Sequence, residues 1–215
     1  MARLMVNPTR MELTRLKKRL STATRGHKLL KDKRDELMKQ FLDLVRLNEQ
    51  LRLHVESSLE EAYGGFAVAG AVMSRKAVEQ TFLYPKQSVA IEMDFKNIMS
   101  VNVPRYSITT KTDNIGDIYP YGFSGTPGAL DDAVNVMSSV LTDMLRLAET
   151  EKTVKLLAEE IEKTRRRVNA LEYVMIPQLQ ETIRYITMKL EENDRGNLSR
   201  LMKVKDMMLE EKYKN

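Results

Sequence analysis

Apolar residues recur at alternating steps of three and four along the N-terminal part of the chain, beginning at Leu13. The repeat runs through Leu13, Leu16, Leu20, Ala23, His27, Leu30, Arg34, Leu37, Phe41, Leu44, Asn48, Leu51, Val55, Ser58 and Ala62. A heptad pattern sustained over this length predicts a helix that pairs with another helix along one seam. Four polar residues interrupt the seam, and such residues usually fix the register at some cost in stability.

The first helix has two possible starts and one predicted end. Asn7 is a candidate N-cap with Pro8 at the first helical position, whereas Thr9 and Glu12 form a candidate capping box. The sequence does not choose between them. The pair Gly64-Gly65 predicts the end of this helix.

A second heptad-patterned stretch begins at Thr126-Pro127-Gly128 and continues from Leu130 to Leu190, after which Val204 and Met208 carry the pattern on. Pro177 lies inside it and predicts a kink that does not end the helix. The segment 193–197 (NDRGN) is a second weak position, where the helix could fray or break.

The lengths of the two stretches predict how they pair. About 55 residues in the first helix and about 80 in the second correspond to about 80 Å and 120 Å at the helical rise per residue. If they pair antiparallel, about 25 residues at the C-terminus form a tip without a partner helix. The apolar residues of that tip require a partner surface; they are Leu198, Leu201, Val204 and Met208.

The middle of the chain carries the β signal. Val89, Ile91, Met93 and Phe95 alternate with other residues, which predicts a half-buried strand. A second strand is predicted at 99–103, which Pro104 confines to a sheet edge or ends. The small residues of 66–82 predict a short packed helix, and a long loop rich in Gly and Pro leads to the second heptad stretch.

The predicted fold class is therefore mainly α. N- and C-terminal segments form a long antiparallel two-helix coiled coil, and a small central module holds a short helix and a β-hairpin. The corresponding boundaries are 1–62 for the first coiled-coil helix, 63–128 for the central module and 129–215 for the second coiled-coil helix.

Composition fits an extended helical protein. Aromatic residues make up 6% and charged residues 30% of the chain, and Cys is absent. Without Cys no disulfide can form, which favours a reducing compartment. Because no apolar run reaches the length of a bilayer span and no signal-peptide pattern opens the chain, we expect a soluble or peripheral, cytoplasmic protein.

Catalytic, cofactor and metal signatures are weak. Gly65 and Gly70 have the spacing of a phosphate loop, but Ala71-Val72 follow where Lys and Ser or Thr are required. The two histidines, His27 and His54, lie on or beside the seam without a second ligand one turn away. We therefore expect no cofactor, no metal and no intrinsic enzyme activity.

Charge is more informative. The chain carries a net charge of +5, and residues 10–39 contain eleven basic but only four acidic residues. A second basic cluster is Arg165-Arg166-Arg167, and a third comprises Arg195, Arg200, Lys203 and Lys205. These residues either form a solvated coiled-coil surface or a basic collar for an acidic or carbonyl-lined partner. Nucleic acid is a competing partner, but no set of aromatic side chains for base stacking accompanies the cations.

Two distant motifs resemble a known family. The run 7–20 (NPTRMELTRLKKRL), with Ala23, Gly26-His27 and 29–37 (LLKDKRDEL), resembles the start of the D subunit of V-type and archaeal A-type rotary ATPases. The run 164–172 (TRRRVNALE), followed by Ile176-Pro177, is a second match in the same order and spacing. The resemblance covers nearly the whole chain, although 193–197 is less typical of the family.

The resemblance implies a non-catalytic central rotor shaft. Such a shaft enters a ring of alternating catalytic and regulatory subunits, binds the small F subunit along the middle of its coiled coil, and connects to a membrane-side stalk subunit. It couples ATP hydrolysis or synthesis to rotation of the membrane ring and to transport of protons or sodium ions. The implied location is the cytoplasmic face of a membrane, as a peripheral part of the complex, with no nucleic acid bound and no direct membrane insertion.

The resemblance also implies two sets of contact residues. The ring set, predicted to touch the catalytic ring, comprises Arg15, Lys18, Arg25, Lys28, Lys31, Arg34, Arg165, Arg166, Arg167, Arg195, Arg200, Leu201 and Met208. The base set, predicted to touch the membrane-side stalk protein, comprises Val89, Ile91, Met93 and Phe95. The alternative function is a non-rotary coiled-coil tether or scaffold whose basic surface binds anionic partners. An enzyme in its own right is a third reading, which predicts turnover by the purified chain.

Overall fold

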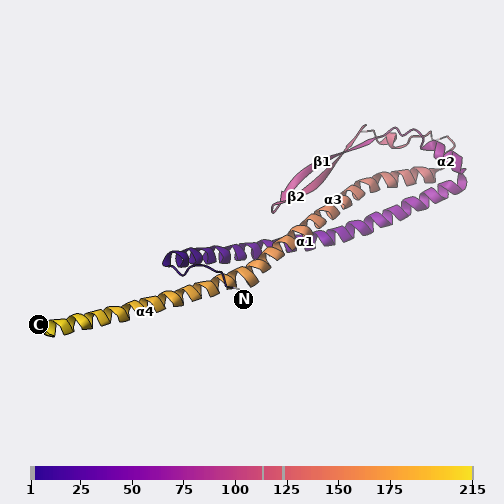
Figure 1. Ribbon diagram of the computed structural model, residues 1–215. Helices are drawn as coiled ribbons and strands as arrows, with labels where there is room; N and C mark the ends of the chain where they lie inside the picture. The colour runs from indigo at the N-terminus through magenta and orange to yellow at the C-terminus, as the bar shows by residue number, and fades with distance from the viewer. Residues whose placement is uncertain (1–2, 113, 123, 215) are drawn as a thin grey trace. The chain divides into compact units, whose positions relative to one another are not determined.

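The computed structural model describes residues 3–112, 114–122 and 124–214, and it is mainly helical (Figure 1). In chain order the elements are α1 (Arg10–Val72), α2 (Arg75–Thr81), β1 (Val89–Ile98), β2 (Val101–Thr110), the 3-10 turn η1 (Ile115–Ile118), α3 (Gly128–Ala170), the π-helical turn η2 (Leu171–Met175) and α4 (Ile176–Lys214). Two long terminal helical stretches and one antiparallel hairpin confirm the predicted fold class.

The chain forms two compact units. Unit 1 comprises Met1–Asp35 and Glu162–Asn215, and unit 2 comprises Glu36–Ile161. The long helices α1 and α3 each contribute residues to both units. Each unit therefore contains one stretch of the N-terminal helix and one stretch of the C-terminal helical run.

Thr9 is the N-cap residue of α1. Its hydroxyl oxygen accepts a hydrogen bond from the backbone N–H of Glu12 at 3.2 Å, which satisfies one of the unpaired donors of the first turn. Asn7 instead offers its backbone carbonyl to the N–H of Thr9 at 2.9 Å. The structure thus selects the second of the two candidate starts.

The predicted end of α1 at Gly64-Gly65 is wrong, because the helix continues to Val72. Gly65 lies where α1 approaches α3 closely: a Cβ atom on it would lie 2.9 Å from Cβ of Ala133 and 3.4 Å from the carbonyl oxygen of Ala129. Ala62 and Ala69, on either side of Gly65, are fully buried. This glycine therefore permits close helix packing in unit 2 and does not terminate the helix.

The helix expected over 66–82 divides differently. Residues 66–72 complete α1, and the separate helix α2 begins after Ser74, whose hydroxyl accepts from the N–H of Ala77 at 3.3 Å. Beyond it, edge-to-face contacts link Phe66 to Phe82 and Phe82 to Tyr121, with ring centroids 6.2 and 6.1 Å apart. This aromatic cluster joins the last turns of α1 to the residue after α2 and to the segment before α3.

The hairpin confirms the first predicted strand and corrects the second. β1 starts at Val89 as expected, but Met99 and Ser100 form the turn with φ values of 49° and 74°, so β2 begins only at Val101. The Asn97 side chain accepts from the N–H of Ser100 at 3.0 Å and so supports this turn without a glycine. Pro104 lies inside β2, opposite Phe95, and does not end the strand, since each strand of a two-stranded sheet has a free edge.

The core of unit 2 joins the hairpin to both helices. Val101 and Val103 of β2 pack with Leu37 of α1 and with Leu157 and Ile161 of α3, and all five side chains are buried. Farther along α1, His54 lies 3.6 Å from Asp143 of α3. Residues later in α1 thus contact residues earlier in α3, so the two helices are antiparallel within this unit.

The second helical stretch begins at Gly128 as predicted, and its interruption takes the form of a π-helical turn. The N–H of Ile176 donates to the carbonyl oxygen of Leu171, five residues earlier, directly before Pro177. Pro177 itself has no backbone N–H, and its ring would clash with the carbonyl group four residues earlier in a regular α-helix. The wider π-helical turn directly before it relieves this clash. The break considered at 193–197 is absent, because α4 is continuous from Ile176 to Lys214.

Unit 1 has a core of its own. Leu16 of α1 packs with Leu179 and Ile186 of α4, and all three are at most 2% exposed. Arg10 pairs with Asp194 at 3.0 Å, and His27 lies 3.4 Å from Glu172. These pairs show that α1 and the C-terminal helical run are antiparallel in unit 1 as well.

Candidate functional site

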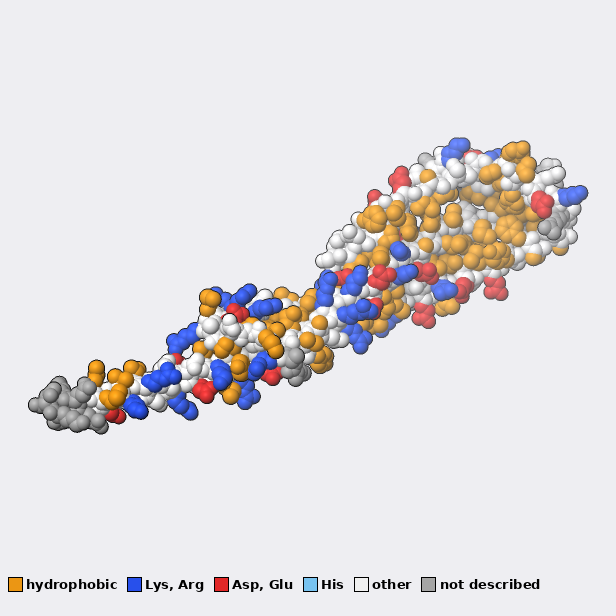
Figure 2. Space-filling view, in the orientation of Figure 1, with side chains coloured by type: hydrophobic (Ala, Val, Ile, Leu, Met, Phe, Trp, Pro, Cys, Tyr) orange, Lys and Arg blue, Asp and Glu red, His pale blue; other side chains and the backbone are white. Residues whose placement is uncertain are grey.

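All thirteen residues of the ring set lie in unit 1, within its two sequence ranges. The basic members other than Arg34 are exposed, and they belong to α1, α3 and α4. Figure 2 shows Lys and Arg side chains along the surface of these helices. Residues that are more than 130 positions apart in sequence, such as Arg34 and Arg165, are thereby collected on one folded body. This gathering is a property of the antiparallel pairing.

Some of these cations already have intramolecular partners. Arg15 lies 3.6 Å from Glu12, and Arg166 pairs with Glu162 one turn away. Each pair joins neighbours three or four residues apart on one helix, and such pairs are worth only a few tenths of a kcal/mol. They leave the side chains available to exchange partners when another protein approaches.

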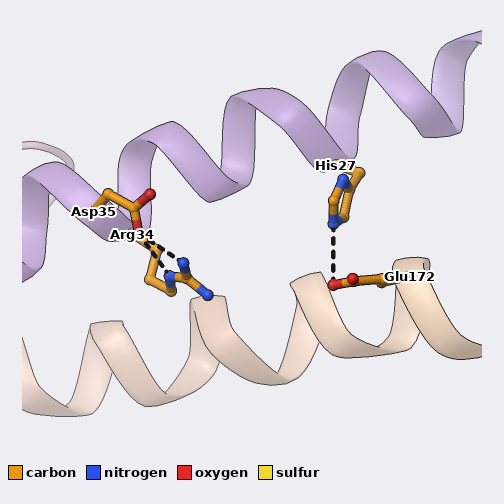
Figure 3. A network of polar contacts seen from close by, with 4 residues as sticks. All are labelled: His27, Arg34, Asp35 and Glu172. Atoms are coloured by element: carbon orange, nitrogen blue, oxygen red, sulfur yellow. Dashed lines mark hydrogen bonds and ion pairs between the residues drawn. The ribbon is translucent and has the colours of Figure 1, made fainter.

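The side chains of Arg34 and His27 both point from α1 toward the opposite helix (Figure 3). The Arg34 guanidinium donates to the Asp35 carboxylate from Nε at 2.9 Å and from Nη2 at 2.7 Å, and the side chain is 29% exposed. His27, with a side chain 20% exposed, reaches Glu172 at the π-helical turn. Both residues therefore occupy the seam positions that the heptad pattern assigned to them.

The N-terminal segment 3–9 packs on α4, a feature that sequence reasoning missed. The backbone N–H of Leu4 donates to the Thr182 hydroxyl at 3.2 Å, and Leu4 and Val6 pack against the Leu16, Leu179 and Ile186 core. The Arg3 guanidinium lies 3.7 Å from the centre of the Tyr185 ring, in cation–π geometry. The alternation of Leu4 and Val6 around exposed Met5 was the signal in the sequence.

The apolar tip of α4 is uncovered, as expected. Its exposed apolar side chains are Leu198, Leu201, Met202, Val204, Met207, Met208 and Leu209, each 43–66% exposed. Two of them, Leu201 and Met208, belong to the ring set. The other five include Met202, Met207 and Leu209, which the seam pattern alone did not single out.

The base set lies on β1 in unit 2, but the expectation that this strand is half-buried is wrong. Val89, Ile91, Met93 and Phe95 are 40%, 52%, 54% and 66% exposed. The buried residues of the hairpin are instead Val101 and Val103 of β2, and the apolar side chains of the base set stay exposed. The reason is that the buried side chains near the turn come from β2, and of β1 only Ile98, which is outside the base set, packs against that core.

An apolar hollow opens in unit 2 beside the start of β1 (Figure 2). Its volume is about 330 Å³. The lining comes from the end of α1, the residue that follows α2, the start of β1, η1 and α3, and includes Phe66, Phe82, Val89, Met137, Leu141 and Met144. Val89 thus links the base set to this hollow.

Titratable chemistry is sparse in the described part of the chain. Tyr121 donates a hydrogen bond to Asp131 at 2.8 Å, and burial together with this bond to a carboxylate raises the Tyr121 pKa above its usual range. Within the described residues there is no group of three His, Asp or Glu side chains that could hold a metal ion. Among the helices so described, none has an apolar stretch of the length that crosses a bilayer.

Comparison with known proteins gives a consistent result. The family model for the ATP synthase D subunit matches residues 12–206. The chain is 63% identical over 213 residues to the V-type ATP synthase D subunit of Acetivibrio thermocellus, covering 99% of this chain and 96% of that protein. It is 59% identical to the proteins of the same name from Clostridium novyi, covering 98% of each chain, and from Clostridioides difficile, covering 100% of this chain and 98% of that protein. With the antiparallel helix pairs and the hairpin, these matches show that the chain belongs to the family of V-type ATP synthase D subunits.

Proposed function

We propose that this chain is the central-stalk rotor subunit of a V-type ATPase. It couples ATP hydrolysis or synthesis in a ring of catalytic and regulatory subunits to rotation of a membrane ring and to ion transport. As a member of the D-subunit family, it is a structural and not a catalytic component. It acts at the cytoplasmic face of the membrane as a peripheral component.

The observation that carries the proposal is the gathering of all ring-set residues on unit 1. Two antiparallel helices of different sequence have no three-fold symmetry, so three equivalent interfaces around them face three different surfaces. Closure of one interface then favours one orientation of the helix pair, and turning the pair changes which interface is favoured. Exposed arginines suit this role because a guanidinium forms directional, forked contacts with carboxylates and carbonyls.

The other partners are assigned to unit 2. We assign the membrane-side stalk subunit to the exposed apolar face of β1, formed by Val89, Ile91, Met93 and Phe95. Four apolar side chains on one face of a strand without a covering layer are typical of a protein-binding surface. The F subunit binds the paired stretches of α1 and α3 along the middle of the coiled coil.

The test is reconstitution with a V-type catalytic ring that lacks its rotor. The wild-type chain is expected to co-elute with the ring at a stoichiometry of one and to change its rate of ATP hydrolysis. The R165E/R166E/R167E variant is expected to weaken assembly or coupling, since it reverses three exposed charges, while its helical circular dichroism stays unchanged. The matched R165K/R166K/R167K variant keeps the charge and removes only the forked geometry.

Two outcomes contradict the proposal. If the wild-type chain does not insert into the ring, the non-rotary tether is the better description. If the Glu variant binds and supports turnover like the wild type, the arginine cluster is only a solvated surface.

A further inference from the structure

The β-hairpin contacts the long helices of unit 2 mainly through β2. Three residues of this strand are buried and two are half-buried, namely Val101, Val103, Pro104, Tyr106 and Ile108. All residues of β1 before Ile98 are exposed. The contacts that hold β2 on the helices therefore decide how β1, and with it the base set, is presented to another protein.

The pairing register shows which backbone groups of β2 point away from β1. The N–H of Lys111 donates to the carbonyl oxygen of Ser88 at 3.0 Å, and the register continues to Tyr106 opposite Met93. Hydrogen-bonded and non-hydrogen-bonded pairs alternate along antiparallel strands, so the N–H of Tyr106 points outward from the hairpin. The neighbouring outward position is Pro104, which has no N–H to donate.

Glu149 of α3 accepts this outward N–H. Its Oε2 atom lies 3.3 Å from the backbone nitrogen of Tyr106, and both residues are half-buried. A carboxylate binds a backbone N–H more strongly than a neutral acceptor does, and such a bond gains strength away from bulk water. Because Tyr106 pairs with Met93, the contact fastens the hairpin at the level of the base set.

Two hollows flank this contact along β2. One, of about 340 Å³, is lined by residues 103–105 together with residues of α1 and α3. The other, of about 290 Å³, is lined by Ile108 and Thr110 together with residues of α3. Where hollows separate a strand from the helices, few apolar contacts resist its movement. Among the described residues, the bond from Tyr106 to Glu149 is the polar contact that ties this stretch of β2 to α3.

We propose that Glu149 is a positioning residue for the contact with the membrane-side stalk subunit. Its carboxylate holds β2 on α3 and so fixes the direction in which β1 presents the base set. Without this acceptor the middle of the hairpin is free to lift from α3, and the partner then spends part of its binding free energy on ordering the hairpin. This inference rests on the proposed function, which assigns the stalk subunit to the base set.

The test measures binding of the membrane-side stalk subunit to the full-length chain with its F subunit bound, and it uses three variants. E149A removes the acceptor, E149Q keeps an amide oxygen of the same reach, and E151A makes the same change at an exposed position two residues farther along α3. We expect E149A to bind the stalk subunit about tenfold more weakly, E149Q to bind within about threefold of wild type, and E151A to bind like the wild type. The helical circular dichroism of all three variants should match that of the wild type.

Hydrogen exchange in the free chain gives a readout that does not depend on the partner. The Tyr106 amide is expected to exchange at least about tenfold faster in E149A than in the wild type, because its acceptor is gone. The amide of Val103, which belongs to a hydrogen-bonded pair with Lys96, should stay protected, since the hairpin itself remains paired.

The outcomes separate this inference from the proposed function. If the wild type binds the stalk subunit and E149A binds it equally well, Glu149 is a stability contact only, and the proposed function stands. Unchanged exchange at Tyr106 in E149A, or an E149Q variant that binds as weakly as E149A, also contradicts the role of the accepted hydrogen bond. If the wild-type chain enters the catalytic ring but does not bind the stalk subunit, the base-set assignment and this inference are both wrong, while the ring contact stands.

Discussion

Adjacent glycines in α1 provide a matched pair for testing how closely α1 and α3 pack. An alanine at Gly65 places its Cβ 2.9 Å from Cβ of Ala133, whereas an alanine at Gly64 meets nothing within 4 Å. Both positions are helical, so both substitutions remove the same backbone flexibility from the unfolded chain. The difference between the two variants therefore isolates the helix contact.

The expected magnitudes follow from two opposing terms. Glycine to alanine inside a helix stabilises by about 1 kcal/mol, and G64A is expected to gain that amount. In G65A the same gain is opposed by overpacking, because carbon atoms prefer separations of about 3.5–4.0 Å and the flanking residues are fully buried. Overpacking of a core costs about 1–3 kcal/mol, so G65A is expected to be neutral or destabilised by up to about 2 kcal/mol.

Thermal unfolding followed by circular dichroism separates these cases. For a chain of this size, 1 kcal/mol shifts Tm by about 2–4 °C, so G64A should unfold a few degrees above the wild type and G65A at or below it. A double-mutant cycle with A133G adds a direct check. Because A133G removes the opposing Cβ, its effect on the free energy of unfolding should be about 1–2 kcal/mol more favourable in the G65A background than in the wild type. If G65A is stabilised as much as G64A, the close approach of α1 and α3 at Gly65 is wrong.

Three further predictions concern polar groups in the two units. The Oδ1 atom of Asn48 is buried without a hydrogen-bond partner among the described residues, so N48L is expected to stabilise the chain by about 1–2 kcal/mol in urea unfolding; a destabilised variant would show that the amide is satisfied. Y121F removes the hydrogen bond to Asp131 and is expected to cost about 1 kcal/mol at neutral pH. The pKa of Tyr121 is higher in the folded than in the unfolded state, so the wild type loses stability as pH rises past about 10. The difference in free energy of unfolding between the wild type and Y121F should therefore shrink above that pH. A difference that stays constant up to about pH 11 contradicts this. T182V removes the acceptor for the N–H of Leu4, so hydrogen exchange at Leu4 should quicken while residues 36–161 are unaffected; unchanged exchange means that the contact is not maintained in solution.

Several features of the fold could be predicted from the sequence because they depend on short-range periodicity. The heptad repeat predicts both long helices and the seam positions of Leu16, Leu37 and Val168, which are buried. The alternation at Val89–Phe95 predicts β1. The gathering of the ring set follows from antiparallel pairing once the helix lengths are known, and unit 1 contains all of its members.

Other features depended on contacts between distant segments, which leave little trace in local patterns. Gly65 reads as a helix terminator in sequence, but the presence of Ala133 opposite it makes it a packing residue. The alternation of β1 predicts an apolar face, but whether that face is covered depends on which side chains pack against α1 and α3, and the buried ones are Val101 and Val103 of β2. The packing of residues 3–6 on α4 likewise needs the core of unit 1 to exist first.

The sequence by itself determined that this protein has two long helical stretches that pair and a hairpin between them in the chain, because the hydrophobic periods of helices and strands are visible in consecutive residues. The uncovered tip of α4 also followed from the sequence, because the second helical stretch is longer than the first. Only the tertiary structure decided that the apolar face of β1 stays exposed while Val101 and Val103 of β2 are buried. The physical reason is that a residue's exposure depends on what the rest of the chain places against it.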